Sequence, residues 1–182
     1  MPRMSELTKA AAPGVWFAPL RFTVEDGPFS RADLVFTGVD HSDASYEVRA
    51  FLNNREATAD TPRDPARGYA GRFVIFGHGG CYGDLGHCDV PAPASDPTDL
   101  RLPHPLTPAT KLITVTDALR KILQEQPEGL WGVTLVAVAK AAVRDKRGPT
   151  DTLARFDAVE LQTYLSDTEL DAVTTSQRVP VA

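Results

Sequence analysis

The sequence predicts an all-β protein, an antiparallel β-sandwich of about seven short strands with one short helix and long loops rich in proline and glycine. Three observations lead to this fold class. Runs of β-branched and aromatic residues, several of them alternating with polar residues, recur along the 182-residue chain. Fifteen prolines argue against a helical bundle. Only one stretch spaces its apolar residues as an amphipathic helix does.

The expected strands follow one another with turn-forming residues between them. Ser45–Leu52 alternates apolar and polar residues until Phe51 breaks the pattern. In Phe156–Leu165 the more apolar alternate set contains Val159 and Leu161, so we expect this set to face the core. The other expected strands are Trp16–Val24, Ala32–Val39, Gly71–Gly77, Lys111–Val115 and Gly132–Ala139.

A short helix is expected after the strand that ends at residue 115. Thr116 or Asp117 can cap its first turn, and Pro127 and Gly129 end it. Its apolar stripe consists of Leu119, Ile122 and Leu123. We expect this helix to cover one edge or end of the sheets.

Two long connections, 53–71 and 89–110, separate expected strands, and loops of this length are usually functional or mobile. The predicted sandwich domain spans 16–165. Residues 1–15 are assigned to an N-terminal extension, and the polar residues 166–182 are expected to form a flexible C-terminal tail.

The overall charge limits the classes of partner. A net charge of −5 and a pI near 5.3 argue against nucleic acid and anionic membranes as partners. No apolar run approaches a membrane span, and the N-terminus lacks the apolar stretch of a signal peptide. As written, the chain is expected to be cytoplasmic, with co-export alongside a partner left open.

The most chemically suggestive segment spans residues 76–90. It contains both cysteines, Cys81 and Cys88, and two of the four histidines, His78 and His87. Five glycines separate them and allow the backbone to turn these side chains toward one point. Thiolate and imidazole donors suit Cu(I) or Zn(II), so copper or zinc is the expected cofactor.

Three interpretations of this segment remain open. In the first, His78, Cys81, His87 and Cys88 hold one metal ion, although His87 and Cys88 are adjacent and could share it only in a turn. In the second, a Cys81–Cys88 disulfide closes the loop and stabilises it by about 2.5 kcal/mol. In the third, the thiols stay reduced and the side chains only satisfy local packing and hydrogen bonds.

Several motifs between about residues 30 and 165 resemble a known family. They are Tyr46–Asn54, Ala59–Pro62, Tyr69–Gly71, Phe76–Cys81, Gly86–Pro91, Pro103–Pro108 and Val115–Arg120. Together they resemble the non-catalytic C-terminal β domain of bacterial tyrosinase-like type-3 copper proteins, the polyphenol oxidases.

The resemblance implies an accessory role without catalysis. The catalytic domain of that family is helical and holds two coppers with six histidines, whereas this chain has four histidines in all. The β domains of the family lie over the copper site as a lid, an intramolecular chaperone or an aid to copper loading. The chain here would therefore need a separate tyrosinase-like oxidase as its partner, in the manner of the small caddie proteins of some bacterial tyrosinases.

Three further residues acquire roles under this resemblance. Tyr82 could enter the copper cavity of the partner and imitate a phenolic substrate, or it could simply pack on its own loop. Asp84 and Asp89 could hydrogen-bond to histidine ligands, or they could form turns beside glycine.

Two other function classes stay open. The chain could be a self-sufficient binding or structural β-sandwich module, with zinc or a disulfide as a staple in the Cys/His segment. A third possibility is an enzyme in which Cys81 pairs with His78 or His87 as nucleophile and base, but no catalytic signature surrounds them.

Overall fold

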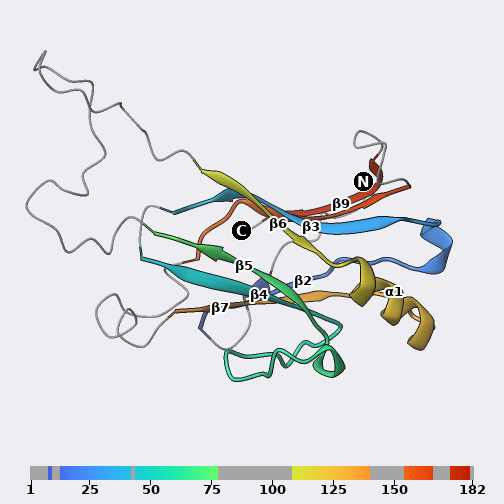
Figure 1. The fold of residues 1–182 in the computed structure, drawn as a ribbon, viewed down its shortest axis with the longest axis horizontal. Helices are drawn as coiled ribbons and strands as arrows, with labels where there is room; N and C mark the ends of the chain where they lie inside the picture. The colour runs from blue at the N-terminus through green and yellow to red at the C-terminus, as the bar shows by residue number, and fades with distance from the viewer. Residues whose placement is uncertain are drawn as a thin grey trace, which may run out of the picture.

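Two antiparallel β-sheets packed face to face confirm the all-β prediction (Figure 1). The computed structural model describes residues 8–9, 13–41, 44–77, 108–139, 154–165 and 173–180, with 8–9 and 173–177 described by their backbone. One α-helix, α1 (Thr116–Glu125), and two 3-10 turns, η1 (Val24–Asp26) and η2 (Pro65–Arg67), accompany the strands in these ranges.

The sheets contain five and four strands. Sheet I has the order β1 (Thr8–Lys9), β2 (Val15–Ala18), β7 (Val133–Val138), β4 (Tyr46–Leu52) and β5 (Tyr69–Ile75). Sheet II has the order β6 (Ala109–Thr114), β3 (Arg31–Val39), β8 (Ala158–Tyr164) and β9 (Val173–Pro180). Every pairing within the two sheets is antiparallel.

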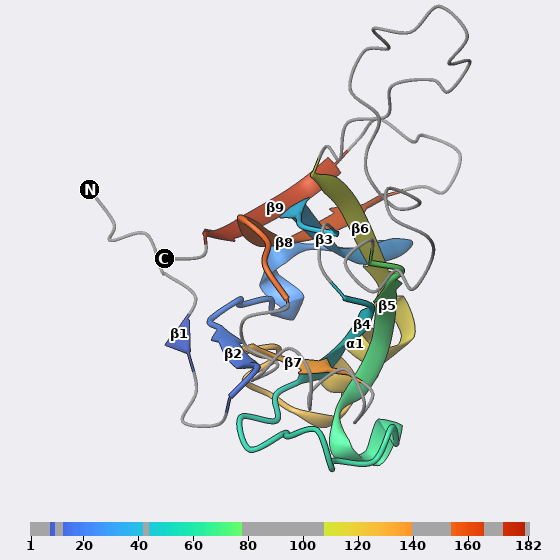
Figure 2. The same ribbon diagram turned by 90° about the vertical axis from the view of Figure 1, so that its left-hand side faces the viewer.

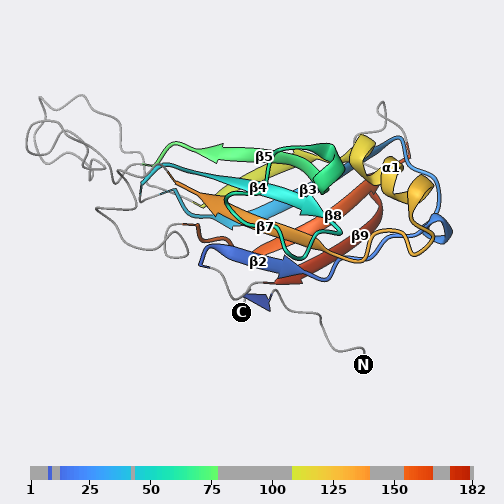
Figure 3. The same cartoon turned by 90° about the horizontal axis from the view of Figure 1, so that it is seen from below.

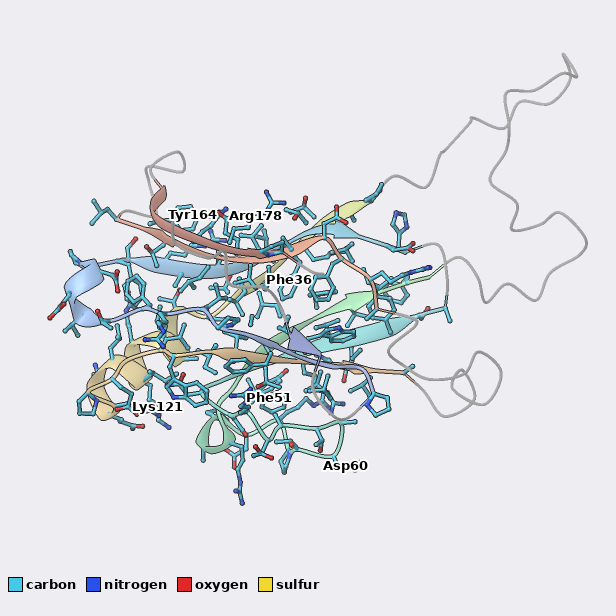
Figure 4. All side chains as sticks on the ribbon, turned by 180° about the vertical axis from the view of Figure 1, so that it is seen from behind. Phe36, Phe51, Asp60, Lys121, Tyr164 and Arg178 are labelled. Atoms are coloured by element: carbon cyan, nitrogen blue, oxygen red, sulfur yellow. The ribbon has the colours of Figure 1, made fainter. Side chains whose placement is uncertain are left out.

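The core lies between the two sheets and follows the pleat of the strands. Alternate residues of β4, beginning with Tyr46, point inward and are buried. Phe36 of β3 lies among them (Figure 4), and its ring centroid is 4.8 Å from that of Phe73 and 5.5 Å from that of Phe156. Val159 and Leu161 of β8 also face this core, as their alternation predicts.

Phe51 breaks the alternation of β4 because sheet I is covered on its outer face as well. The connection from β4 to β5, residues 53–68, folds back over this face. There Phe51 packs with Val15, Ala57 and Val136, and its ring centroid is 5.6 Å from that of Tyr69. The outward side of β4 is therefore apolar at this one position, because Phe51 packs in a second, smaller apolar cluster on the outer face of the sheet.

The sandwich is closed along one side by β5 and β6, which lie next to each other although they belong to different sheets (Figure 2). The approach is close enough that a Cβ built on Gly71 would lie 2.6 Å from Cγ2 of Ile113. Glycine at position 71 therefore allows the edge of sheet I to touch the edge of sheet II.

Helix α1 confirms the predicted apolar stripe but not the predicted cap. Leu119 and Ile122 are buried. Thr116 is the first helical residue rather than a cap, and the residue before it, Val115, makes no side-chain capping bond. The Thr116 hydroxyl instead accepts a hydrogen bond from the backbone N–H of Ala32, 3.0 Å away, and so attaches the start of the helix to β3.

The structure differs from the sequence prediction at both ends of the chain. Within the expected extension 1–15, β1 pairs with β2. Within the expected tail 166–182, β9 pairs with β8 along most of its length, and Val179 is buried. Pro180 fits this strand because β9 lies at the edge of sheet II, where a missing N–H costs little.

The connections divide between two ends of the sandwich (Figure 3). At one end of the sandwich, β3, β5 and β7 finish. Strands β4, β6 and β8 start at this same end. Helix α1 and the turns η1 and η2 lie at the opposite end.

Candidate functional site

The donor side chains predicted from the sequence lie outside the described residues. They are His78, Cys81, Tyr82, Asp84, His87, Cys88 and Asp89. The metal site, the disulfide and the role of Tyr82 in a partner's cavity therefore stay predictions. The structure does describe the chain on either side of this segment, at Gly77 and at Pro108.

The connection 78–107, which contains these donors, leaves and re-enters the sandwich at one end of a single edge. It leaves after β5 and returns at the start of β6, and these two strands run side by side (Figures 1 and 2). The backbone N–H of Gly77 donates to Oγ of Ser45, 3.1 Å away, which fixes the point where the chain leaves. Both ends of the connection 78–107 are therefore attached to the described sandwich.

Three apolar side chains are exposed on these same two strands. Phe76, immediately after β5, is 84% exposed, Leu112 of β6 is 51% exposed and Val74 of β5 is 41% exposed. We call these three residues the edge patch. Single exposed apolar residues are common, and Val74 and Leu112 face outward from different sheets, so Phe76 is the one of the three with the most apolar surface left to cover.

A charged cluster lies beside the edge patch on sheet I. Glu47, whose position on β4 pairs with Val74, accepts a hydrogen bond from Nε of Arg49 at 2.6 Å and contacts the guanidinium of Arg72. Burial alone would raise the pKa of Glu47, but the hydrogen bonds from Arg72 and Arg49 outweigh it and hold the pKa below its ordinary value. With two arginines and one glutamate, the cluster carries one net positive charge next to the patch.

A second candidate site is a groove of about 300 Å³ at the helical end of the sandwich. It lies between α1 and the residues at and beyond the end of β4, and we call it the helix groove. Leu52, Tyr69 and Ile122 contribute apolar surface to it, while Arg67, Lys121 and Glu125 contribute charge. Sequence reasoning missed this groove because its two walls come from segments more than forty residues apart.

Asn53 holds the two walls of the helix groove together. Its Nδ2 donates to Oε1 of Gln126 at 2.6 Å and to the carbonyl of Gly129 at 2.8 Å. Its Oδ1 accepts from the backbone N–H groups of Trp131 and Gly132 at 2.9 and 3.3 Å. Gly68 completes the wall, since a Cβ there would lie 2.3 Å from the carbonyl oxygen of Leu52.

Within the described ranges, no group of three or more His, Cys, Asp or Glu side chains is placed to hold a metal ion. The same part of the chain contains no helix that is both long and apolar enough to span a membrane. No protein-family model matches the chain, and no curated protein matches it either. The tyrosinase-like resemblance therefore stays a prediction from the motifs.

Proposed function

We propose that the chain is a non-catalytic accessory protein of a tyrosinase-like copper oxidase, and that it docks over the copper site of that partner. One observation carries this proposal. The connection 78–107, which contains the four soft donors His78, Cys81, His87 and Cys88, is attached at both ends to the edge that exposes Phe76. A candidate docking surface and both attachment points of the donor-bearing connection thus share one end of the molecule.

The edge patch supplies a reason to dock. Covering a phenylalanine that is now 84% exposed would stabilise a complex by about 2 kcal/mol, and Leu112 and Val74 would add to it. A complex formed in this way would bring the donor-rich segment against the partner. There it could shield the copper site or transfer copper through thiolate and imidazole groups.

In this proposal, the charged cluster determines how the chain is oriented on its partner. Arg72 is 45% exposed and lies next to the patch, so an acidic rim on the partner would favour one docking geometry. Such rim charges contribute more to orientation and association rate than to affinity.

The experiment uses the full chain and the copper oxidase that accompanies it. Phe76→Ser is compared with Val24→Ser, since Val24 is also apolar and 71% exposed but lies in η1 at the opposite end of the sandwich. We expect Phe76→Ser to weaken the complex about tenfold or more and Val24→Ser to leave it unchanged. Equal affinities for the wild type and Phe76→Ser would refute the docking surface.

Copper delivery is tested separately from docking. In a Cys81→Ser, Cys88→Ser double variant, we expect normal binding to the oxidase with less copper incorporated, as measured by metal analysis and oxidase activity. Unchanged copper incorporation would remove the delivery role and leave a lid or chaperone role.

The second candidate function is a self-sufficient binding or structural module. The complete core between sheets I and II favours it, because a chain with such a core has no need of a partner to fold. Metal analysis and thiol titration of the purified protein distinguish the two functions. One tightly held zinc, or a quantitative disulfide, together with no effect on any oxidase supports the module.

A further inference from the structure

The helix groove has a small apolar area beside its charged groups. Leu52 and Ile122 lie in its lining but are only 2% and 7% exposed, so the half-buried Tyr69 supplies more of its apolar surface than they do. A volume of about 300 Å³ is at the lower end of the range for ligand sites, which limits an occupant to roughly ten heavy atoms.

The charges around the groove do not cancel. Lys121 and Glu125 are one turn apart on α1, so their fields largely offset each other. Arg67 comes from η2, on the other wall, and its guanidinium makes no ion pair with any described residue. The uncompensated charge of the groove is therefore one guanidinium, the group that recognises carboxylates best.

The walls of the groove are set before any ligand arrives. Asn53 fixes the end of α1 against the end of β4 through its bonds to Gln126 and Gly129. Asn54 donates to the carbonyl of Arg67 at 2.7 Å, which holds the backbone of that residue in place. A preformed site binds without the cost of ordering its walls.

We propose that the helix groove binds a small organic monoanion, a carboxylate with a compact apolar body. The carboxylate pairs with the guanidinium of Arg67, and the apolar body lies beside Tyr69. This site is separate from Phe76, which directly follows β5, because β5 ends at the end of the sandwich opposite α1 (Figure 3).

The test uses the full-length protein and three probes of similar shape, namely phenylacetate, 2-phenylethanol and phenethylammonium. Binding is followed by two-dimensional NMR. We expect phenylacetate to bind with a dissociation constant in roughly the millimolar range and to shift the amides of 66–69 and 118–126. The neutral and cationic probes should bind about tenfold more weakly or not at all.

Two matched variants localise the charge. Arg67→Gln should weaken phenylacetate binding about tenfold. Arg63→Gln makes the same change at an exposed arginine outside the groove lining and should alter binding less than about twofold. Ala66→Trp places a bulky side chain at an exposed position of the lining and should abolish binding.

Circular dichroism confirms that each variant is folded before its affinity is compared. If Arg67→Gln does not fold, the comparison of the three probes on the wild type decides alone. Equal affinity for phenylacetate and 2-phenylethanol would overturn the proposal, as would equal losses in Arg67→Gln and Arg63→Gln. A failure here leaves the docking role of Phe76 untouched, because that residue lies outside the groove.

Discussion

Asn53 combines an unusual backbone conformation with a fully used side chain. Its φ of 51° lies in the left-handed region, and no other non-glycine residue in the described ranges has a positive φ. Asparagine tolerates this region better than most residues. The side chain makes four hydrogen bonds to the turn that follows α1. One residue thus ends β4, turns the chain and attaches the helix.

Asn53→Ala should lower the free energy of unfolding by about 2–4 kcal/mol, because it loses these hydrogen bonds and leaves alanine with a positive φ. Asn53→Gly loses the same bonds without the backbone penalty and should be about 1 kcal/mol less destabilising. Urea denaturation measures both.

Asn54→Ala serves as the control for the Asn53 variants, since Asn54 is a half-buried neighbour whose side chain bonds only within the loop. We expect it to cost less than about 1 kcal/mol. If Asn53→Ala cost no more than this control, the bridging role of Asn53 would be wrong.

Tyr46 is a buried residue whose hydroxyl ionises only at alkaline pH. Its hydroxyl donates to the carbonyl of Asp40 at 2.9 Å, and the residue is 4% exposed. Burial, reinforced by the nearby charge of Asp40, raises the pKa of Tyr46 from 10.0 to about 12.

The unfolded chain therefore loses this proton near pH 10, while the folded protein keeps it until about pH 12. Stability should fall by about 1.4 kcal/mol per pH unit between these values. We expect Tyr46→Phe to be less stable than the wild type below pH 10, with a difference that shrinks from pH 10 to pH 12. Urea midpoints across this range measure the difference, and a constant gap would contradict the assignment.

At the scale of the elements, the outer face of sheet I shows how one strand is stabilised from both sides. Phe51 packs under the covering loop 53–68, and Arg49 donates to the carbonyl of Ala59 at 2.8 Å in the same loop. The carboxylate of Glu47 in turn holds Arg49 and links β4 to Arg72 of β5. The covering loop, β4 and β5 are therefore joined through one carboxylate.

Glu47→Gln should destabilise the protein by about 1–2 kcal/mol near neutral pH, because its side chain is 14% exposed and paired with two arginines. The pKa of Glu47 is lowered in the folded state, so its contribution is present above the ordinary value of 4.5 and is lost as the pH falls through the folded pKa.

The free energies of unfolding of wild type and Glu47→Gln should therefore converge in acid. Glu56→Gln, at an exposed position in the covering loop, provides the matched control and should differ little from the wild type at any pH. A cost for Glu47→Gln that persists unchanged in acid would show that lost packing, rather than charge, explains it.

At the scale of the whole molecule, β9 is the longer of the two strands that sequence reasoning left out. It pairs with β8 and contributes Val179 to the core. Because β9 covers one edge of β8, removing it would expose a row of unpaired backbone groups as well as apolar core.

A chain truncated after Leu165 should lose more than about 3 kcal/mol of stability, bind a hydrophobic dye and aggregate through the open edge of β8. A chain that lacks only Val181 and Ala182 is the control and should melt like the wild type. Thermal melts and light scattering measure both. Equal melting temperatures for the two truncations would mean that β9 contributes nothing to stability.

The two candidate sites use opposite ends of the molecule. Phe76 and the attachment points of the connection 78–107 lie where β5 ends and β6 begins, whereas the helix groove lies beside α1. Docking at one end therefore leaves the other open, and the two proposals can be tested independently.

The sequence by itself determined what has a local periodic signature. Alternation identified the strands around Val48 and Val159, and the spacing of Leu119 and Ile122 identified α1, because each element buries one face against the core. The Cys/His segment was also evident from its residues, although the roles of its side chains stay predictions.

Only the tertiary structure decided what depends on contacts between distant segments. The apolar side chain of Phe51, the closure of β5 against Ile113 and the helix groove around Arg67 each join parts of the chain far apart in sequence. Such contacts leave no periodic pattern in either segment, because the sequence pattern of each segment reflects its own secondary structure and not the distant segment that it contacts. β9 was missed for a related reason, since a polar edge strand becomes recognisable only once β8 is beside it.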